Sequence, residues 1–385
     1  MSKAYTVKKT GMLNLLSIML LVACSDDKPQ KRSALKGLGD TAGSFEKPTK
    51  AHKITFPQAH APQKSFQQEW WYLTANLMTE SGQALATQWT LFRRGVEDKH
   101  WYFAHAALAD TKLHRSAFRS AREELGTLVI NSQPFYATIA DWQWQSSAGL
   151  LPATLRYGNG ISIDGYLQAQ KSSNQAAIAP QQESPWLVEL HLNVDENTQG
   201  KGHYFLQGDN GYSQKHPSLA IASYYYSQPF IKVSGTVFWQ HKWQKVTGNA
   251  WFDREWGSQM LAEDQQGWDW FSLRLNEHTA LMVYRLRSTE KAYLYGSIMR
   301  RDGTMKVLSS HDIKLTPLDA KTLNGHFSYP ERFLITIEQD NIDIEVSVIN
   351  KKQIMRFGIE YFEGMVSFSG SHQGQGFLEM TGYAQ

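Results

Sequence analysis

Short apolar and aromatic runs, each followed by turn-forming residues, recur from Trp70 to the C-terminal end of the chain. The first run, residues 70–77, alternates large apolar side chains with small or polar ones and ends at Glu80-Ser81-Gly82. This alternation is typical of β-strands, and the sequence has no long amphipathic helical period. Aromatic residues make up 12% of the sequence and favour strands as well, because their side chains pack well on a pleated surface.

The number and spacing of these runs predict an all-β protein. Many short strands with regular turns form a sandwich or a barrel, and so many runs favour two barrels over one. Asp302-Gly303 predicts a hairpin turn. The segment His241-Lys242-Trp243 separates two runs, so we expect domains at residues 54–242 and 243–385. The later runs are residues 84–92, 101–108, 187–194, 230–239, 248–256, 268–275, 280–287, 292–300, 333–338, 342–348, 364–368 and 376–382.

Composition and missing motifs exclude several classes of function. Lysine and arginine total 39 against 36 acidic residues, and a net charge of +3 argues against a nucleic-acid partner. A single cysteine excludes a disulfide framework and a cysteine-built metal site. The sequence also lacks a phosphate-binding loop, a Gly-x-Ser-x-Gly nucleophile and a His-Glu-x-x-His zinc motif. We therefore expect no metal site and no cofactor.

The first 23 residues carry the pattern of a secretory signal. Lys8 and Lys9 precede the apolar run 12–23, which is short for a membrane span. That run ends in Leu21-Val22-Ala23-Cys24, which resembles the lipobox of bacterial lipoproteins. We therefore predict a signal peptide over residues 1–23 and lipid attachment at Cys24. An uncleaved anchor with a chance cysteine is the alternative.

Residues 24–53 are polar and rich in charges, glycine, proline and serine, which predicts a flexible tether between the lipid and the fold. Ser25 follows the predicted lipidation site, whereas an aspartate there would suggest retention at the inner membrane. The expected location is therefore the bacterial cell envelope, with the protein lipid-anchored and facing the periplasm and with the outer membrane favoured.

The first strand of the series carries the first candidate site, Glu69-Trp70-Trp71-Tyr72. Neighbouring residues in a strand face opposite sides, so Glu69 shares a face with Trp71, and Trp70 shares the other with Tyr72. We predict that Glu69, Trp71 and Tyr72 bind a ligand in an aromatic pocket. The alternative is a core anchor, because tryptophan and tyrosine bury large areas in ordinary strand packing.

The second candidate site is the sequence Asp-Arg-Glu-Trp at residues 253–256. Strand alternation places Asp253 and Glu255 on one face with Trp251, a candidate ligand-binding residue, and turns Arg254 toward the other face. A carboxylate that faces a closed apolar cavity has a raised pKa and can act as a general acid. Asp253 and Glu255 are therefore candidate catalytic residues. A buried arginine–carboxylate lattice that closes one barrel is the alternative.

His105 is the third candidate catalytic residue, as a proton donor or acceptor in the cavity. Alternation places it on one strand face with Trp101 and Phe103. His100 lies on the opposite face, so the two histidines cannot clamp a metal ion between them. A core histidine with its hydrogen bonds satisfied is the alternative.

Two further aromatic segments, residues 224–226 and 267–271, belong to the candidate ligand site. Such residues can line a long apolar cavity and contact a polyene or acyl chain, although a filled barrel core has the same composition. Three arginines on neighbouring runs would either hold an anionic head group or form a salt-bridged rim. The aromatic candidates are Tyr224, Tyr226, Trp268 and Trp270, and the arginines are Arg274, Arg285 and Arg287.

Together these motifs resemble the AttH family, a lipocalin-like group related to carotenoid 1,2-hydratase (hydroxyneurosporene synthase). The match runs from about Ile54 to Ala384, with the motifs in order. This resemblance implies two lipocalin-like antiparallel β-barrel domains packed together. Besides the two candidate sites above, it is carried by Ala104-His105-Ala106-Ala107-Leu108, Ser223-Tyr224-Tyr225-Tyr226-Ser227, Gly267-Trp268-Asp269-Trp270-Phe271 and Leu378-Glu379-Met380-Thr381-Gly382-Tyr383.

The family implies more than one function. Some relatives hydrate isoprenoid double bonds, fungal ones guide cycloadditions, and the AttH branch is commonly associated with an ABC transporter. In the hydratases the aspartate that matches Asp253 is the favoured proton donor, but the residues around it differ here. Arg254 in particular is expected to lower the pKa of Asp253 and weaken it as an acid, which counts against carotenoid hydration.

Three functions therefore stay open. The favoured one is an envelope lipoprotein that binds a long apolar ligand, isoprenoid- or acyl-like, in association with an ABC transporter. The first alternative is a hydratase-type lyase that acts on an apolar alkene, with Asp253, Glu255 and His105 as its polar centre. The second is a structural lipoprotein without a small ligand, which pairing of Arg254 with both carboxylates in a dry core would support.

Overall fold

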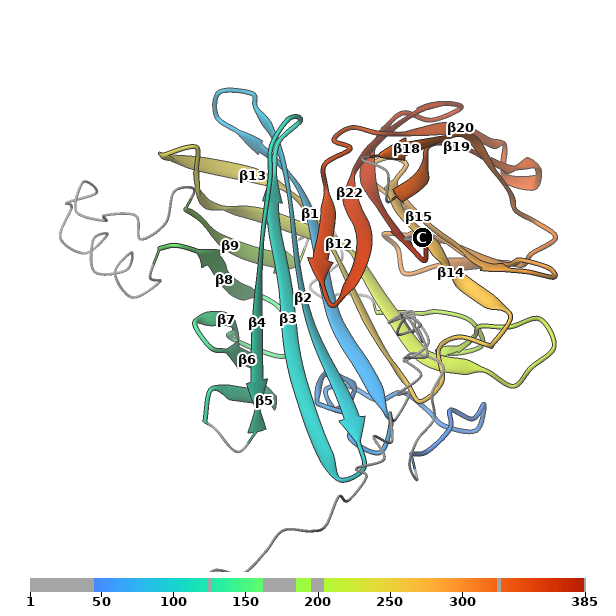
Figure 1. Ribbon diagram of the computed structural model, residues 1–385, viewed down its shortest axis with the longest axis horizontal. Coiled ribbons are helices and arrows are strands. Elements are labelled where there is room, and N and C mark those ends of the chain that lie inside the picture. Colours follow the sequence, from blue (N-terminus) through green and yellow to red (C-terminus); the bar gives the residue numbers. More distant parts are fainter. Residues whose placement is uncertain (1–44, 124–125, 162–184, 195–203, 324–326, 384–385) are drawn as a thin grey trace, which may run out of the picture. The chain divides into compact units, whose positions relative to one another are not determined.

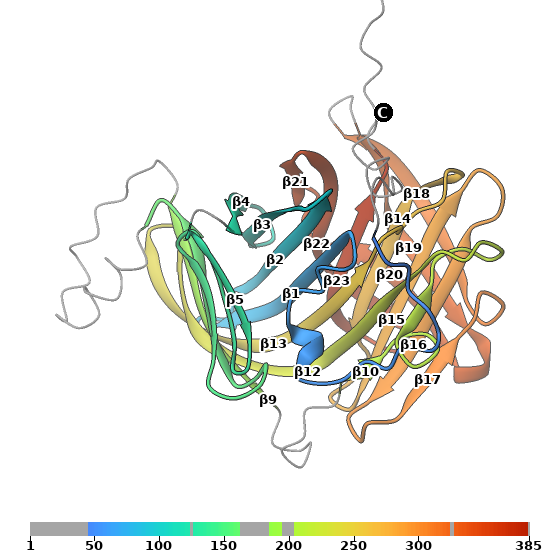
Figure 2. The ribbon, with the colours of Figure 1, turned by 90° about the horizontal axis from the view of Figure 1, so that it is seen from below.

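The fold consists of two antiparallel β-sheets (Figure 1). The computed structural model describes residues 45–123, 126–161, 185–194, 204–323 and 327–383. Within these ranges the first sheet contains β1–β13 and the second contains β14–β23. Each sheet curls toward a closed barrel (Figure 2). The predicted fold, two lipocalin-like antiparallel β-barrel domains packed together, is confirmed.

Hydrogen bonds order the first sheet as β4-β3-β2-β1-β13-β12-β9-β8-β7-β6-β5, with β10 and β11 paired to β12. Most neighbours in this order also follow one another in sequence, because short turns can join antiparallel strands. Its strands are β1 (Gln68–Thr79), β2 (Ala84–Val96), β3 (Lys99–Ala109), β4 (His114–Arg122), β5 (Leu128–Ser132), β6 (Phe135–Ile139), β7 (Trp142–Ser146), β8 (Ala153–Asn159), β9 (Trp186–Val194), β10 (Phe205–Leu206), β11 (Tyr212–Gln214), β12 (Ala222–Trp239) and β13 (Lys242–Gly257).

The second sheet follows the order β17-β16-β15-β14-β23-β22-β20-β19-β18, with β21 paired to β22. The predicted hairpin turn at Asp302-Gly303 joins β16 to β17, and Gly303 has a φ of 91°. Its strands are β14 (Gln265–Arg274), β15 (Thr279–Ser288), β16 (Tyr293–Arg300), β17 (Met305–Leu308), β18 (Lys314–Leu323), β19 (Phe327–Ile337), β20 (Ile342–Val348), β21 (Ile354–Phe357), β22 (Ile359–Gly370) and β23 (Gly374–Thr381). The described ranges also contain the short 3₁₀ helices η1 (Gln58–His60) and η5 (Glu338–Asp340).

The change from one sheet to the other occurs later in the chain than the domain boundary expected at residues 242–243. β13 starts at Lys242 and pairs with β1 from Val246 to Gly257, and its other edge pairs with β12. Both of its edges are therefore used within the first sheet, and the second sheet begins only at Gln265. The boundary between the sheets lies in residues 258–264.

Strand alternation places most of the described buried apolar side chains in three large clusters. One apolar cluster fills the first barrel and contains Trp71, and another fills the second barrel and contains Phe271. A third cluster combines residues of both sheets, among them Tyr72 and Trp270. Adjacent residues of one strand, such as Trp71 and Tyr72, thus belong to different cores. The third cluster holds the polar residues described next.

The predicted signal peptide, Cys24 and the first part of the predicted tether lie outside the described residues. The described end of that tether contacts the first sheet. The Thr49 N–H donates to the Tyr224 hydroxyl, which donates in turn to the Thr49 carbonyl, at 2.7 and 2.9 Å. The Ser258 hydroxyl donates to the carbonyl of Glu46. A search of the described residues for a helix able to cross a membrane finds none.

Candidate functional site

A row of polar residues crosses three strands of the first sheet, on the face that turns toward the second sheet. Tyr72 of β1 lies directly opposite Asp253 of β13, which lies opposite Ser227 of β12. The Asp253 carboxyl group is only 2% exposed. Its Oδ1 accepts a hydrogen bond from Ser227 Oγ at 2.5 Å, and its Oδ2 accepts one from Trp251 Nε1 at 3.0 Å. Burial nevertheless raises the pKa of Asp253 to about 7.

Arg254 does not act on Asp253 as the sequence analysis expected. As strand alternation predicts, Arg254 faces the interior of the first barrel, where its guanidinium binds the Glu69 carboxylate. In the described structure neither the Asp253 nor the Glu255 carboxylate forms an ion pair with it, and it reaches Glu255 only by donating to the backbone carbonyl at 3.1 Å. The expectation that Arg254 lowers the pKa of Asp253 is therefore wrong, because the two side chains lie on opposite faces of the strand. Arg254 therefore gives no reason to exclude hydration.

A second row of residues crosses the facing sheet. Trp270 of β14 lies opposite Glu379 of β23, which lies opposite Glu363 of β22. Trp268 Nε1 donates to Glu379 at 3.0 Å. Burial raises the pKa of Glu379 to about 8. Burial and then the nearby Glu379 carboxylate raise the pKa of Glu363 well above its ordinary value, although the hydroxyl groups of Tyr72 and Tyr361 lie close enough to oppose this rise by hydrogen bonding.

Aromatic side chains join the two rows. The Trp270 ring meets the Tyr72 ring edge-on at 5.4 Å and the Trp251 ring at 6.3 Å, between centroids. Its Nε1 donates to the Tyr225 hydroxyl at 3.2 Å. The charges of Glu255 and Asp253 contribute to the raised pKa of Glu379, so the carboxyl groups of the two sheets interact electrostatically. The two rows together are called the acidic centre below. They place carboxyl groups with raised pKa values among indole and phenol rings.

Glu255, the second candidate catalytic residue, forms an ion pair. Its Oε1 lies 2.7 Å from Lys215 Nζ and accepts a hydrogen bond from Ser223 at 2.5 Å. The Lys215 ammonium also stands over the Tyr225 and Tyr284 rings, at 5.1 and 4.7 Å from their centroids. This charge-assisted contact fixes the position of the Glu255 carboxylate.

His105, the third candidate, contacts the second sheet at a different point. Its Nδ1 lies 2.9 Å from the Tyr361 hydroxyl of β22, and its ring packs near Phe92 and Phe357. Burial lowers the pKa of His105 to about 3, so the imidazole is neutral at neutral pH. The structure does not bring it into contact with Asp253.

The predicted ligand-binding residues divide between two cores. Tyr72, Trp251, Trp268 and Trp270 belong to or border the cluster between the sheets. The other four lie in the first barrel, where Glu69 binds both Arg93 and Arg254 and the Trp71 ring lies 3.9 Å from the Arg254 guanidinium. These contacts match the alternative of a buried arginine–carboxylate lattice. The barrel residues are Glu69, Trp71, Tyr224 and Tyr226.

The three candidate arginines contact groups of the protein itself. Arg285 and Arg287 each lie 2.6 Å from a different oxygen of the buried Asp269 carboxylate. Arg274 donates instead to the carbonyl groups of Pro229 and Ala250. These arrangements favour structural roles over the binding of an anionic head group. No group of three metal-ligating side chains suited to a metal ion occurs in the described ranges.

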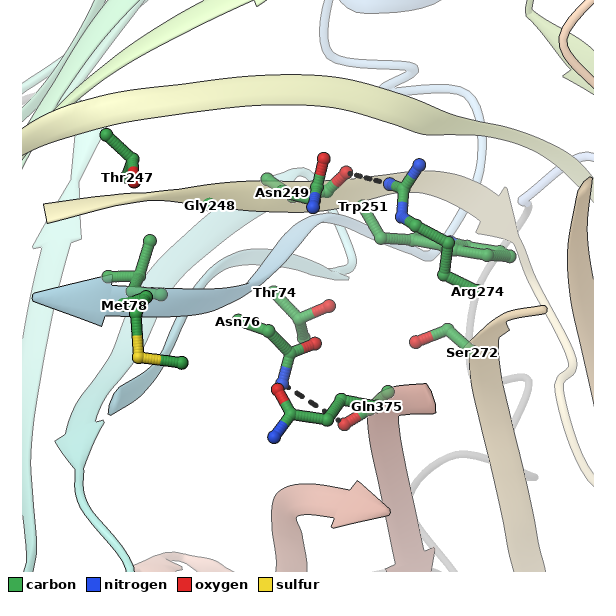
Figure 3. A pocket seen from close by; sticks show the side chains of 13 residues that line it. Thr74, Asn76, Met78, Thr247, Gly248, Asn249, Trp251, Ser272, Arg274 and Gln375 are labelled. Atoms are coloured by element: carbon green, nitrogen blue, oxygen red, sulfur yellow. Dashed lines mark hydrogen bonds between the residues drawn. The ribbon is translucent and has the colours of Figure 1, made fainter. Parts of the chain in front are cut away.

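A pocket of about 310 Å³ opens beside the acidic centre, between β1 and β13 of one sheet and β14 and β23 of the other (Figure 3). It lies on the same strand faces, because Thr74 opposite Trp251 is the next pair after Tyr72 opposite Asp253. Trp251 lines the pocket and donates to Asp253, so its indole stands between the pocket and the carboxyl group.

Sequence reasoning did not single out Lys215, Ser227, Glu363 or Glu379 as site residues. The two glutamates had a detectable signal, because each is an isolated charge within an apolar run, Tyr361-Phe362-Glu363 and Phe377-Leu378-Glu379. Lys215 and Ser227 had none, because their partners Glu255 and Asp253 are remote in sequence and meet them only through strand pairing and loop packing.

Comparisons with known proteins agree with this fold. A crystal structure assigned to an AttH protein of Nitrosomonas europaea superposes with a TM-score of 0.73 and 25% identity, covering 89% of this chain and all of that one. Kievitone hydratase from Nectria haematococca superposes with a TM-score of 0.61 over 89% of this chain and 97% of its own, and at 14% identity it shares the fold. A search of curated protein sequences returned no match. The AttH-like family model matches residues 47–383, and the protein therefore belongs to the AttH-like family.

Proposed function

We propose that this protein is a hydratase-type lyase that adds water to an electron-rich carbon–carbon double bond, with Asp253 as its acid. The observation that carries the proposal is the buried Asp253 carboxyl group beside an open pocket, with its neighbour Arg254 turned away. Because the pKa of Asp253 is about 7, about half of these side chains hold a proton at neutral pH. A general acid is most effective when its pKa lies near the working pH.

The reaction needs one acid and one water molecule. The Asp253 carboxyl group gives its proton to one carbon of the double bond, and the π electrons form the new C–H bond. The cation left on the other carbon is stabilised by the face of a nearby indole, of Trp251 or Trp270, by about 2 kcal/mol in a dry site. Water adds to that carbon and returns a proton to the Asp253 carboxylate, so the net change is the addition of one water.

The strength of the acid restricts the substrate. A carboxylic acid with a pKa near 7 is weak, so it protonates carbon only when the double bond is rich in electrons and the resulting cation is stabilised. A trisubstituted alkene of the isoprenoid kind meets both conditions. Trp251 has to turn aside or share its hydrogen bond for the alkene to reach Asp253, because its indole lies between the carboxyl group and the pocket.

Family membership supports an enzyme of this type more than a carrier. The AttH-like family model spans the chain, and the fold is shared with kievitone hydratase, whose name states a hydration reaction. The kievitone hydratase structure supports the architecture alone. The role of Asp253 is inferred from the burial and contacts of that residue in this chain.

The test is turnover in ¹⁸O-labelled water. The purified chain is incubated with a panel of soluble prenylated phenols and alkenols, and products heavier than their substrates by one labelled water are detected by mass spectrometry. Asp253→Asn is expected to lower turnover by about 10²–10⁴-fold, the usual contribution of a general acid, while the fold and ligand binding persist.

The matched control is Asp343→Asn, at an exposed aspartate of the second barrel. It is expected to leave turnover unchanged. Full activity in Asp253→Asn contradicts the role of this residue, and no labelled product from the unaltered chain across the panel contradicts the hydratase function.

A second candidate function is ligand binding without turnover, which the open pocket favours. The same panel distinguishes the two, because a binding protein retains unaltered substrate through purification and mass spectrometry. The pocket is small and has many polar side chains, which fits a head group better than the long apolar ligand expected from the sequence.

We further propose that the protein is a lipoprotein of the bacterial envelope, anchored through Cys24 and facing the periplasm, where an ABC transporter is a candidate partner. The sequence Leu21-Val22-Ala23-Cys24 supports the anchor. Metabolic labelling with an alkyne fatty acid is expected to mark the unaltered chain, and Cys24→Ala to abolish the label. A label that persists in the variant contradicts the anchor.

A further inference from the structure

The least exposed part of the pocket lining carries two hydroxyl groups. Thr74 of β1 is 2% exposed and Ser272 of β14 is 3% exposed. Both line the pocket, and neither side chain has a hydrogen-bond partner among the described residues. Figure 3 shows the two hydroxyl groups pointing toward the space between the sheets. Because these hydroxyl groups line the pocket and are not engaged by other side chains, each is available to donate and accept a hydrogen bond with a polar group that enters it.

Carboxamide side chains extend this polar lining toward the opening. Asn76 and Asn249 lie directly opposite each other in β1 and β13, and Gln375 approaches from β23. In the described residues the Asn76 amide makes one long contact, 3.5 Å to the Gly376 carbonyl, and neither Asn249 nor Gln375 has a partner. A carboxamide both donates and accepts, so these groups suit a ligand that also does both.

The charge of the pocket argues for a neutral ligand. No carboxylate lines it, so nothing in its described lining would hold an ammonium group. Its one charged residue, Arg274, already donates to the carbonyl groups of Pro229 and Ala250, and its guanidinium stands 5.4 Å from the Phe230 ring centroid. Arg274 therefore joins β14 to the first sheet and is not arranged as a receptor for an anion.

We infer that this pocket binds a neutral polyhydroxylated head group, such as a glycosyl ring, with its hydroxyl groups on the threonine, serine and carboxamides. The Trp251 indole supplies a flat surface for the apolar face of such a ring. A volume of about 310 Å³ is near the lower limit for small-molecule sites, which fits a head group and leaves a chain to extend outside it. In so far as this head group belongs to the alkene substrate, the inference depends on the proposed hydratase function.

Matched ligands test the inference. Binding of geranyl β-D-glucoside, geraniol and geranyl phosphate to the soluble chain is measured by calorimetry. The glucoside is expected to bind about tenfold or more tightly than geraniol, because it adds hydrogen bonds to unpaired groups. Equal affinity for glucoside and geraniol overturns the inference, and so does a geranyl phosphate complex tighter than the glucoside complex.

Variants locate the binding site. Thr74→Val with Ser272→Ala removes both hydroxyl groups at nearly constant shape and is expected to weaken glucoside binding about tenfold without changing geraniol binding. Thr138→Val, a half-buried position of β6 away from the pocket, is the matched control. If the double variant does not fold, as judged by circular dichroism, Asn249→Ala and Gln375→Ala at the accessible part of the pocket replace it, with the same expected loss. Unchanged glucoside affinity in folded variants overturns the inference.

The failure of this inference and that of the proposed function are distinguishable. Asp253→Asn leaves the pocket lining intact, so it is expected to bind the glucoside as the unaltered chain does. Glucoside binding without hydration of any alkene supports the head-group site and counts against the hydratase. If the protein hydrates alkenes that carry no head group but does not bind the glucoside, the hydratase function is supported and the head-group site is contradicted.

Discussion

Glu363 and Glu379 lie directly opposite each other in β22 and β23 where the two barrels meet, and Glu363 is fully buried while Glu379 is half-buried. Side chains in such a pair are close enough to interact directly. Two carboxylates at this separation in a dry site repel each other, so the pair retains protons at a pH where free glutamates are charged.

The first prediction concerns the pH dependence of stability. The pKa of Glu379 rises from 4.5 to about 8 on folding, and that of Glu363 rises as well, so the folded chain holds more protons than the unfolded chain in this range. The free energy of unfolding contributed by the pair is therefore greatest below pH 4.5 and falls as pH rises toward 8. The double variant Glu363→Gln/Glu379→Gln should show a smaller fall between pH 5 and 8, by a few kcal/mol, in urea denaturation. An identical slope in both proteins would contradict the raised pKa values.

The second prediction separates the barrel core from the ligand site. Glu69→Gln removes the carboxylate that pairs with Arg93 and Arg254 and leaves two buried guanidinium groups without their partner. We expect a loss of about 3–5 kcal/mol in the free energy of unfolding, and unchanged glucoside binding by the folded variant. Glu360→Gln, which breaks an exposed pair with Arg356, is the control and should cost about 0–1 kcal/mol. A Glu69 variant of normal stability that has lost ligand binding would assign Glu69 to a ligand site instead.

Local alternation made part of the site predictable. The faces of Asp253, Arg254 and Glu255 followed from their order in one strand, because successive side chains in a strand alternate without reference to the rest of the chain. The same rule separated Trp71 from Tyr72. Strand alternation could not tell which face of a strand contacts the second barrel and which face lies inside the first barrel.

Strands with little apolar character were not predicted. β4, His114–Arg122, is an edge strand with mostly polar or charged residues, so it has no apolar run, and the short strands β5–β8 were not recognised either. The sheet boundary was misplaced because β13 begins with Lys-Trp-Gln-Lys, which has one aromatic residue among polar ones, and its continuous apolar part comes only later. β13 belongs to the first sheet because it forms hydrogen bonds with β1, a strand that is remote in sequence.

The partners of the acidic groups could not be predicted because they come from pairing over long distances in sequence. Glu363 meets Glu379 across one turn, but both meet the first sheet only because the barrels pack together. The pKa of Asp253 depends on the same packing, since burial is the largest cause of its rise. The sequence thus allowed Asp253 to be named as a candidate, and only the packing accounts for its raised pKa.

The third prediction concerns the hydrogen bond between His105 and Tyr361, which connects the two barrels at 2.9 Å. His105→Phe and Tyr361→Phe each leave one buried polar atom unpaired and should each cost about 1–3 kcal/mol in urea denaturation. The double variant removes both partners, so its cost should be smaller than the sum. Additive costs would show that the hydrogen bond contributes nothing. Because the pKa of His105 is about 3, its imidazole should add no step to an activity profile between pH 5 and 8.

The fourth prediction concerns the proton on Asp253. Trp251 Nε1 donates to Asp253 Oδ2, and a hydrogen bond donated to a carboxylate favours its charged form. Trp251→Phe removes that donor and keeps an aromatic ring, so the pKa of Asp253 should rise above its value of about 7, by about one pH unit for one such bond. The carboxyl C=O band in infrared spectra, titrated with pH and identified by its loss in Asp253→Asn, measures this pKa directly and needs no substrate.

Trp268→Phe is the matched control, because the Trp268 indole donates to Glu379 instead. Its removal should move the Glu379 band and leave the titration midpoint of Asp253 nearly unchanged. If the titration midpoint of Asp253 stays at about 7 or falls in Trp251→Phe, the indole does not control the pKa of Asp253. Trp251 would then only separate the pocket from the carboxyl group.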